Sequence, residues 1–259
     1  ETEWELQKIK VPHSILEMLQ TTLREGKWRV TVAVDHDGIM RGIWADFREH
    51  LYGIAVDIGS TTLAAHLCEL GSGEVLSSAG MMNPQIRFGE DLMSRVSYVM
   101  LNQDGEKELT KSVREALNQL SLEVCEQAGI QKEEVMEMVM VGNPVMHHLV
   151  HGINPVELGG APFALATDEA IITPASELDL ELHQLARTYT LPCIAGHVGA
   201  DTAAMVLAEA PHHQEAITLL VDVGTNAEIV LGNRDRLLAA SSPTGPAFEG
   251  AQISSGQRA

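Results

Sequence analysis

The sequence predicts an α/β protein of two lobes, each of which contains a copy of the same strand-turn-strand unit. One unit is residues 51–62 and the other is residues 220–230, and in each an apolar run ends in an aspartate, a glycine and hydroxyl side chains. Short apolar runs bounded by a glycine turn are typical of buried strands. The two aspartates, Asp57 and Asp222, are 165 positions apart. Because this spacing is the length of a small domain, the repeat indicates two related lobes.

Both turns have the chemistry of a phosphate site. Glycine lets a ligand approach the backbone, and the hydroxyls and exposed N–H groups suit phosphate oxygens. Asp57 and Asp222 are the candidate catalytic residues, each placed to hold a magnesium ion through its waters. The same short pattern also occurs in ordinary hairpins, but two facing copies would bind one polyphosphate from both sides. The residues expected to hold phosphate groups are Gly59, Ser60, Thr61, Thr62, Gly224, Thr225 and Asn226.

The composition limits the partners and the compartment. With 259 residues, 45% of them hydrophobic, the chain can bury the core of one or two domains. The net charge of −19 argues against nucleic acid or an anionic membrane as a partner. No signal peptide or apolar span of about 18 residues is present, so we expect a soluble cytoplasmic protein. Cys68, Cys125 and Cys193 are far apart in the chain, which favours reduced core thiols.

Residues 1–51 are expected to be the tail of a preceding linker or middle domain. A helix is predicted over 14–24, and a hairpin over 28–34 and 39–44 because alternating residues flank an Asp-Gly turn. The His-Asp pair at 36–37 could bind a metal, but a solvated turn is the favoured interpretation. The chain starts without a methionine and stops just after a glycine-rich stretch, so we expect a fragment of a longer protein.

Residues 52–209 are predicted to form the first lobe, which begins as a meander. The predicted strands are 51–58, 63–70, 74–79 and 135–141, and the predicted helices are 92–101 and 106–128. The longer helix has a regular apolar stripe and a glycine after its last turn. Arg87, Glu90 and Asp91 lie in the loop before the first helix, where they could reach the phosphate turn or be held by their own ion pairs.

Three histidines lie on a predicted helix after the last of these strands. His147 and His151 have the i, i+4 spacing of a zinc pair, but a helix packed near the cleft is the favoured interpretation. Asp201 lies further on, either as a first-turn acid favoured by the helix dipole or as a residue lining the cleft. The elements predicted around it are a short helix over 176–185, a strand over 191–194 and a helix over 202–210.

Residues 215–259 are expected to be the start of the second lobe. Strands are predicted over 228–231 and 236–240, after the Asp222 turn. A glycine turn at 242–250 then leads into a helix start, which can present backbone donors to an anion. Gly245 and Glu249 belong to this stretch and are expected beside that anion.

The paired turns resemble the two phosphate motifs of the acetate and sugar kinase, Hsp70 and actin superfamily (ASKHA). This resemblance implies a two-lobed RNase H-like fold of the actin-like ATPase type, with the second lobe truncated and the end of a small α/β domain before the first. The cofactors that it implies are ATP and Mg²⁺.

Six motifs in one order narrow the resemblance to the reductive activators of corrinoid proteins. The resemblance implies an ATP-dependent reductase that returns a Co(II) corrinoid to Co(I), with this chain as its nucleotide-binding domain. The implied partner is a corrinoid protein, either a corrinoid iron–sulfur protein or the corrinoid subunit of a methyltransferase, and a homodimer is left open. The motifs are residues 52–62 (YGIAVDIGSTT), 85–91 (QIRFGED), 141–148 (VGNPVMHH), 196–201 (GHVGAD), 221–226 (VDVGTN) and 245–252 (GPAFEGAQ).

The family implied by these motifs also has an N-terminal [2Fe–2S] domain. The cysteines here lack cluster spacing, so the cluster is expected only in the full-length protein, and this chain alone is not expected to transfer electrons. Two alternatives stay open. One is a small-molecule kinase of the same superfamily, which would need a base near the γ-phosphate, and the other is a non-catalytic ATP switch of the actin or chaperone kind.

Overall fold

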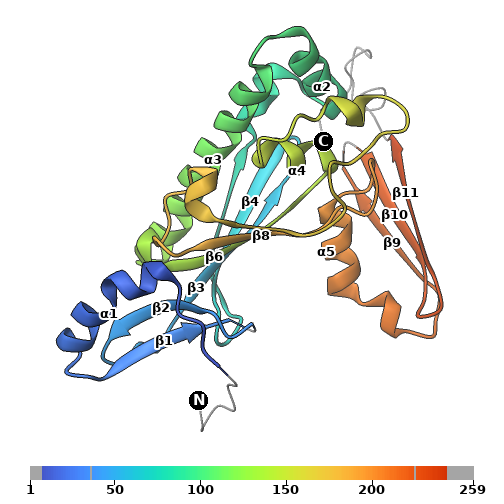
Figure 1. The fold of residues 1–259 in the computed structure, drawn as a ribbon. Coiled ribbons are helices and arrows are strands. Elements are labelled where there is room, and N and C mark those ends of the chain that lie inside the picture. The colour runs from blue at the N-terminus through green and yellow to red at the C-terminus, as the bar shows by residue number, and fades with distance from the viewer. Residues whose placement is uncertain (1–7, 36, 225, 244–259) are drawn as a thin grey trace.

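The computed structural model describes residues 8–35, 37–224 and 226–243. Within these residues the chain forms a two-stranded, a six-stranded and a three-stranded sheet (Figure 1). The strands are β1 (Val30–Val34), β2 (Met40–Ala45), β3 (Tyr52–Ile58), β4 (Thr62–Glu69), β5 (Val75–Met82), β6 (Val135–Gly142), β7 (Ile171–Pro174), β8 (Arg187–Thr190), β9 (Thr218–Val223), β10 (Asn226–Gly232) and β11 (Leu237–Pro243). The helices are α1 (His13–Glu25), α2 (Leu92–Leu101), α3 (Gly105–Ala128), α4 (Pro144–Val150) and α5 (Ala200–Glu209), and the short 3-10 helix η1 is Pro84–Phe88.

The six-stranded sheet has the order β5-β4-β3-β6-β8-β7. Strands β3, β4 and β5 form an antiparallel meander, whereas β3, β6 and β8 run parallel to one another. This is the RNase H-like arrangement that the sequence predicts. Because β3, β6 and β8 are parallel, their carboxyl ends lie at the same edge of the sheet, where ligands of open α/β sheets bind.

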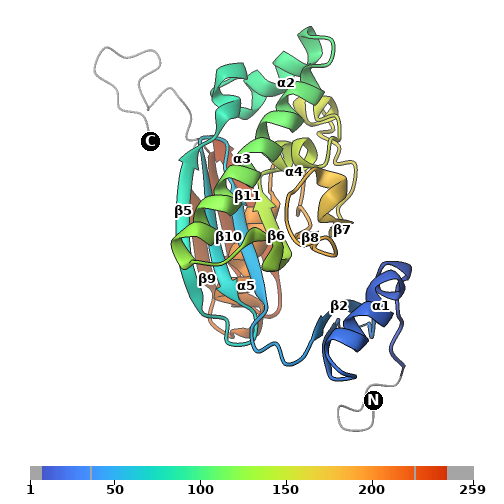
Figure 2. The same ribbon diagram turned by 90° about the vertical axis from the view of Figure 1, so that its left-hand side faces the viewer.

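One face of this sheet is packed against α3, as Figure 2 shows. On β3 the side chains of Ile54, Val56 and Ile58 are buried in that core, while Ala55 and Asp57 on the other face are exposed. The apolar stripe predicted for α3 is confirmed, and each of its residues is at most 1% exposed: Leu109, Val113, Leu117, Leu120 and Val124. Full burial of such a side chain contributes about 1.5–3 kcal/mol to stability. The packed face therefore fixes the sheet, and Asp57 projects from the opposite face.

The three-stranded sheet lies on the other side of α5 from the six-stranded sheet (Figure 1). Strands β9 and β10 are joined by a tight turn and pair antiparallel, with Asp222 directly opposite Glu228. Residues that face each other in an antiparallel pair project from the same side of the sheet. The two carboxylates therefore lie on one face, and α5 contacts both β9 of this sheet and β6 of the larger one.

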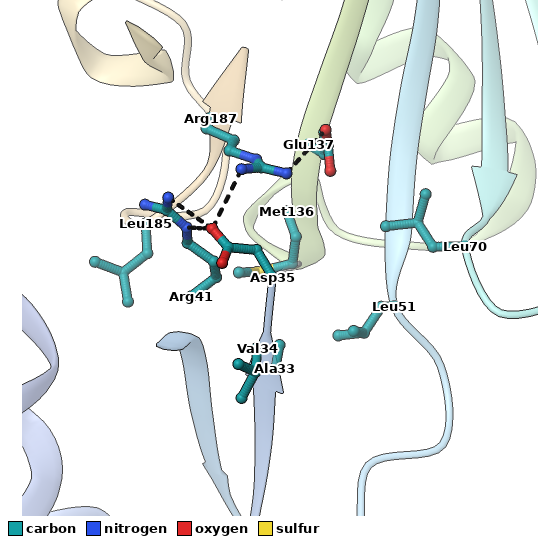
Figure 3. A pocket seen from close by; sticks show the side chains of 10 residues that line it. All are labelled: Ala33, Val34, Asp35, Arg41, Leu51, Leu70, Met136, Glu137, Leu185 and Arg187. Carbon is teal, nitrogen blue, oxygen red and sulfur yellow. Dashed lines mark hydrogen bonds and ion pairs between the residues drawn. The ribbon is translucent and has the colours of Figure 1, made fainter. Parts of the chain in front are cut away.

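The N-terminal part consists of α1 packed on the β1–β2 hairpin (Figure 1). It contacts the larger sheet through a chain of ion pairs, in which the Asp35 carboxylate binds both Arg41 and Arg187, and Arg187 also contacts Glu137 (Figure 3). The Asp35 side chain is only 4% exposed. These residues, with apolar neighbours such as Leu185, line a cavity of about 170 Å³.

Two predictions for the stretch before α5 are wrong. In place of a helix over 176–185 there is a single 3-10 turn at Ala175–Leu178, and the strand is Arg187–Thr190 rather than 191–194. The polar β8 is buried because its hydroxyls have partners: Thr188 donates to the Thr173 carbonyl at 3.2 Å, and Thr190 contacts a histidine. The predicted hairpin, the four first-lobe strands before α4 and the helices α2 and α3 are confirmed.

Candidate nucleotide-binding site

The turn at Gly59–Thr62 joins β3 to β4 at the carboxyl edge of the larger sheet. It is tight at its first residue, since a Cβ on Gly59 would lie 2.5 Å from the Thr62 carbonyl oxygen. Any larger residue at position 59 would have to displace the backbone. Asp57 stands two residues before the turn, on the exposed face of β3. The sequence therefore places an acid and a constrained, hydroxyl-rich turn side by side.

Three consecutive carbonyl groups of this turn accept hydrogen bonds from Asn83 and Arg95. The Asn83 side-chain amide donates to the Gly59 oxygen at 2.8 Å, the Arg95 guanidinium donates to the Ser60 oxygen, and the Asn83 backbone amide donates to the Thr61 oxygen at 2.8 Å. In a trans peptide the C=O and the following N–H point in opposite directions. The N–H groups of these three peptides therefore point away from Asn83 and Arg95.

Such a row of N–H groups is suited to an anion. Within the described residues, the amides and hydroxyls of Ser60 and Thr61 donate to no protein acceptor. Successive backbone N–H groups that converge on one point form an anion-binding concavity, which is the principle of many phosphate sites. The amides of Ser60 and Thr61 are therefore available to an anion, and phosphate binding by this turn stays a prediction.

Asp201 joins the site through close packing of glycines. Gly199 is the N-cap of α5, and a Cβ on it would lie 2.5 Å from the Gly142 carbonyl oxygen at the end of β6. A Cβ on Gly142 would in turn lie 2.7 Å from the Ile58 oxygen at the end of β3. These contacts place the first turn of α5, and with it Asp201, next to the strand ends.

The carboxylates of both sheets influence one another. Burial, with additional repulsion from Asp201 and then Asp222, raises the pKa of Asp57 to about 6. Burial also raises the pKa of Asp201, and Asp222 adds to this shift. The pKa of Glu228 is raised by burial and then by Asp201 and Asp222. Four acids from β3, α5, β9 and β10 therefore share one region, and their charges disfavour one another.

This donor set fits a hydrated divalent cation. Carboxylate oxygens are the ligands that Mg²⁺ prefers, and a cation would relieve the mutual repulsion of Asp57, Asp201 and Asp222. In the part of the chain that the structure describes, no three His, Cys, Asp or Glu side chains are close enough to ligate one ion directly. Binding of Mg²⁺ through its waters therefore stays a prediction for Asp57 and Asp222.

The second predicted turn is described in part. Gly224 and Asn226 lie between β9 and β10, and the Gly224 amide donates to the Asn226 oxygen at 2.9 Å. Thr225, Gly245 and Glu249, which the sequence predicts at the nucleotide, lie outside the described residues. Asp57 and Asp222 are near enough for the charge of Asp222 to contribute to the raised pKa of Asp57, after burial and Asp201.

The histidines on α4 belong to the packing of the protein. His147 and His148 are buried, and the His148 ring contacts the Pro144 carbonyl at 2.8 Å and accepts from the Ala166 amide at 3.1 Å. His151 contacts the Thr190 hydroxyl at 2.9 Å. Burial lowers the pKa of His147 and of His151 to about 4, so both rings are neutral near pH 7. The packed-helix interpretation stays the favoured one, because the rings of His148 and His151 have protein partners.

The loop before α2 contributes residues other than those predicted. Arg87 stacks on Phe88 at 4.6 Å, and Asp91 caps α2 by accepting from the Ser94 amide at 2.7 Å. The residues that reach the phosphate turn are instead Asn83 and Arg95. Sequence reasoning missed both of these, as well as the contribution of Glu228. Asp201 was recognised only as one of two possibilities.

An RNase H-like sheet whose strand β3 ends in an acid and a tight, hydroxyl-rich turn, opposite the acids of a second sheet, is the architecture of an ASKHA-type domain. Residues 1–50 match the model of the RACo linker region, 52–214 the RACo middle region, and 216–259 the C-terminal domain of RACo, the ASKHA domain. The chain belongs to the RACo family. The resemblance to reductive activators of corrinoid proteins is thereby confirmed, whereas the division at 1–51, 52–209 and 215–259 stays a prediction.

Known relatives agree with this assignment. The chain is 35% identical over 235 residues to the corrinoid activation enzyme RamQ of Eubacterium limosum, covering 90% of this chain and 39% of that protein. It is 29% identical over 218 residues to the Co(II) methylated amine-specific corrinoid protein reductase of Methanosarcina barkeri, covering 81% and 39%. The solved structure of a reductive activator for corrinoid, iron-sulfur protein matches with a TM-score of 0.90 and 36% identity, over 100% of this chain and 42% of that one. The chain thus spans about two fifths of the length of these relatives.

No described helix is long and apolar enough to cross a membrane.

Proposed function

We propose that this chain is the nucleotide-binding part of an ATP-dependent activator that returns a corrinoid protein from Co(II) to Co(I). The observation that carries the proposal is the row of N–H groups at Ser60 to Thr62, aimed away from its supports and next to Asp57. The relatives' names, which refer to corrinoid activation and Co(II) reduction, support the reaction. They do not favour a small-molecule kinase or a non-catalytic switch.

Each residue has a defined part in the proposed site. The Gly59–Thr62 turn binds phosphate oxygens through its amides and hydroxyls, and Gly224 to Asn226 bind from the second sheet, with Gly245 and Glu249 near the nucleotide. Asp57 and Asp222 hold the waters of a magnesium ion, and Asp201 adds negative charge beside them. Bound Mg²⁺ would neutralise charge on the phosphates. Nucleotide binding would then draw the two sheets toward a common ligand, which is the conformational step that an uphill electron transfer needs.

The electron carrier is proposed to lie outside this chain. The three cysteines lie on β4, on α3 and in the segment between β8 and α5, and all three are free thiols. Burial raises the pKa of Cys125 to about 11 and that of Cys193 to about 12, so these thiols are not poised to ligate a cluster. The corrinoid protein is the proposed partner, and the cytoplasm is the proposed location.

The proposal is tested with Asp57→Ala and Asp222→Ala. Calorimetry on the chain should give Mg·ATP affinities roughly ten- to a hundredfold weaker than wild type, because each variant loses a charge-assisted interaction. In the longer polypeptide, ATP-dependent reduction of the corrinoid protein should be lost. Normal ATP-dependent reduction by both variants would refute the proposed site, and loss of activity in His151→Ala instead would point to the histidines.

A further inference from the structure

Arg95 is an unusual residue for the middle of a core. Its side chain is 0% exposed, yet the described residues contain no ion pair to it. Its hydrogen bonds go to neutral acceptors only: the carbonyls of Gly89 (3.1 Å) and Ser60, the Gln85 amide oxygen (3.2 Å) and the Met146 sulfur (3.0 Å). Burying a cation without a paired anion is energetically costly. A residue kept at such a cost is expected to have a task beyond packing.

The guanidinium remains charged in this environment. Burial lowers the pKa of Arg95 to about 10, and Asp91 partly opposes this shift. At neutral pH the group is therefore a fixed positive charge directly behind the Ser60 peptide. Because the chain as a whole carries a net charge of −19, Arg95 supplies a local positive charge in a protein that is otherwise predominantly negative.

The segment 83–95 is itself rigidly held. Asn83 is 1% exposed and caps η1 by accepting from the Gln85 amide at 2.9 Å, while the Gln85 side chain donates to the Leu109 carbonyl of α3 at 2.8 Å. The segment thus ties the phosphate turn to the core helix. Motion of the turn relative to α3 would break hydrogen bonds at both ends.

We propose that Arg95 is a positioning residue for the phosphate turn: it orients the Ser60 peptide so that the adjacent N–H faces the ligand, and it supplies the positive charge that a polyphosphate needs behind that turn. Asn83 has the same orienting role without the charge. This inference rests on the proposed function, because the ligand class, a nucleoside triphosphate or another polyphosphate, is that of the proposed site.

The test measures binding of inorganic tripolyphosphate with Mg²⁺ to the full chain by calorimetry, with pyrophosphate and phosphate as less charged probes. Arg95→Met should weaken tripolyphosphate binding roughly ten- to a hundredfold. It should also reduce the difference in affinity between tripolyphosphate and phosphate, because part of that difference comes from the fixed charge. A purely structural role would lower all three affinities by the same factor.

Arg114→Met is the matched control. Arg114 also donates to a backbone carbonyl, that of Val150 at 3.0 Å, and its side chain is 14% exposed, but its charge is paired with Asp179 at 2.9 Å. The Arg114→Met variant should differ from wild type in stability, but the order of its affinities for the three probes and the ratios between them should be unchanged. Circular dichroism melting of each variant shows whether it is folded.

Each outcome decides the question. A folded Arg95→Met variant with wild-type tripolyphosphate affinity overturns the inference. If Arg95→Met does not fold, Arg95→Lys decides, since an ammonium keeps the charge but not the planar fork; binding about three- to tenfold weaker supports the inference, and wild-type affinity overturns it. If the wild-type chain binds no tripolyphosphate, the proposed phosphate site itself fails, which is a different result from an unaffected Arg95→Met variant.

Discussion

At the scale of single residues, Asp57 lies where its ionised form is disfavoured. Asp57 keeps some contact with solvent, but the surrounding protein and the carboxylates of Asp201 and Asp222 raise its pKa to about 6. An acid whose pKa is raised on folding destabilises the folded state increasingly as the pH rises from its ordinary value toward the raised one. Ionised Asp57 therefore destabilises the folded chain when no cation is bound, and such a loss of stability is common at functional sites.

Asp57→Asn should remove this repulsion. Above pH 6, in the presence of a chelator, the melting temperature of the chain should rise by about 2 °C or more, because roughly 1 kcal/mol of stabilisation gives that shift in a chain of this size. The gain should shrink as the pH falls from 6 and disappear below about pH 4, since Asp57 is then protonated in both the folded and the unfolded wild type. Asp168→Asn, at an exposed position between α4 and β7, is the control and should melt as wild type at neutral and at acidic pH. A gain that persists unchanged at pH 5 would contradict the electrostatic explanation.

At the scale of elements, the strand ends and α5 are brought together by glycine contacts. Gly199 and Gly142 let the backbone of the α5 N-terminus touch the end of β6, and no side chain is available to fill or widen that contact. The position of Asp201 therefore depends on a backbone approach rather than on a side-chain interaction. A side chain added at such a contact would force the backbone to shift.

Gly199→Ala should destabilise the chain by about 1–3 kcal/mol, because the new methyl group would lie 2.5 Å from the Gly142 oxygen. It should also weaken Mg·ATP binding by displacing Asp201. Gly160→Ala is the matched control, since nothing lies within 4 Å of a Cβ there and its backbone is extended. Urea unfolding of both variants measures the difference, and equal midpoints would show that the contact is less tight than the structure indicates.

The ion pairs between the β1–β2 hairpin and β8 predict a pH dependence of stability. Burial of Asp35 opposes its ionisation, but hydrogen bonds from the Ile39 amide and Arg41 outweigh burial and lower the pKa of Asp35. A lowered folded pKa means that the stabilisation is present above the unfolded value of about 4 and is lost as the pH falls through the folded value.

Asp35→Asn should therefore cost about 1–2 kcal/mol at pH 7, and the difference from wild type should shrink as the pH falls from 5 to 3. Urea unfolding at several pH values measures this. Asp46→Asn breaks the exposed pair with Arg29, whose side chains are 61% and 79% exposed, and should change stability by less than about 1 kcal/mol. A constant cost of Asp35→Asn from pH 7 to pH 3 would show that its charge is not responsible.

The elements that the sequence predicts correctly are those whose pattern is local in the chain. The β3–β4 turn, α3 and the hairpin are predicted correctly because each has a local pattern of apolar residues, glycine or Asp-Gly. Strand β8 is missed because its threonines are satisfied by partners on other elements, and the apolar run after it is read as the strand instead. Arg95 could not be assigned either, since its partner carbonyl lies 35 positions away in the chain. Residues whose role depends on distant backbone groups leave no local signal.

At the scale of the whole molecule, the proposed nucleotide site and the electron carrier belong to different parts of the protein, because the described residues contain no cluster of three or more His, Cys, Asp or Glu side chains that could hold a metal. The family relatives are more than twice as long, so the redox step can be supplied by sequence beyond the matched region. The three cysteines lie on separate elements, and none pairs with another. Cluster ligation needs several thiolates at one point, which these positions do not offer.

The chain purified under anaerobic conditions should therefore be colourless and contain far less than one iron per chain. Replacing all three cysteines by serine should leave the iron and sulfide content unchanged, because none of them is a cluster ligand. With a chemical reductant, Mg·ATP and a corrinoid protein, the chain alone should not accelerate formation of Co(I), whereas the longer polypeptide should do so only when ATP is added. Iron and acid-labile sulfide analysis, with the optical spectrum of the corrinoid, measures both parts. Stoichiometric iron and sulfide that disappear in the cysteine variant would mean that this part of the protein carries the electron itself, and that the separation of nucleotide binding from electron transfer is wrong.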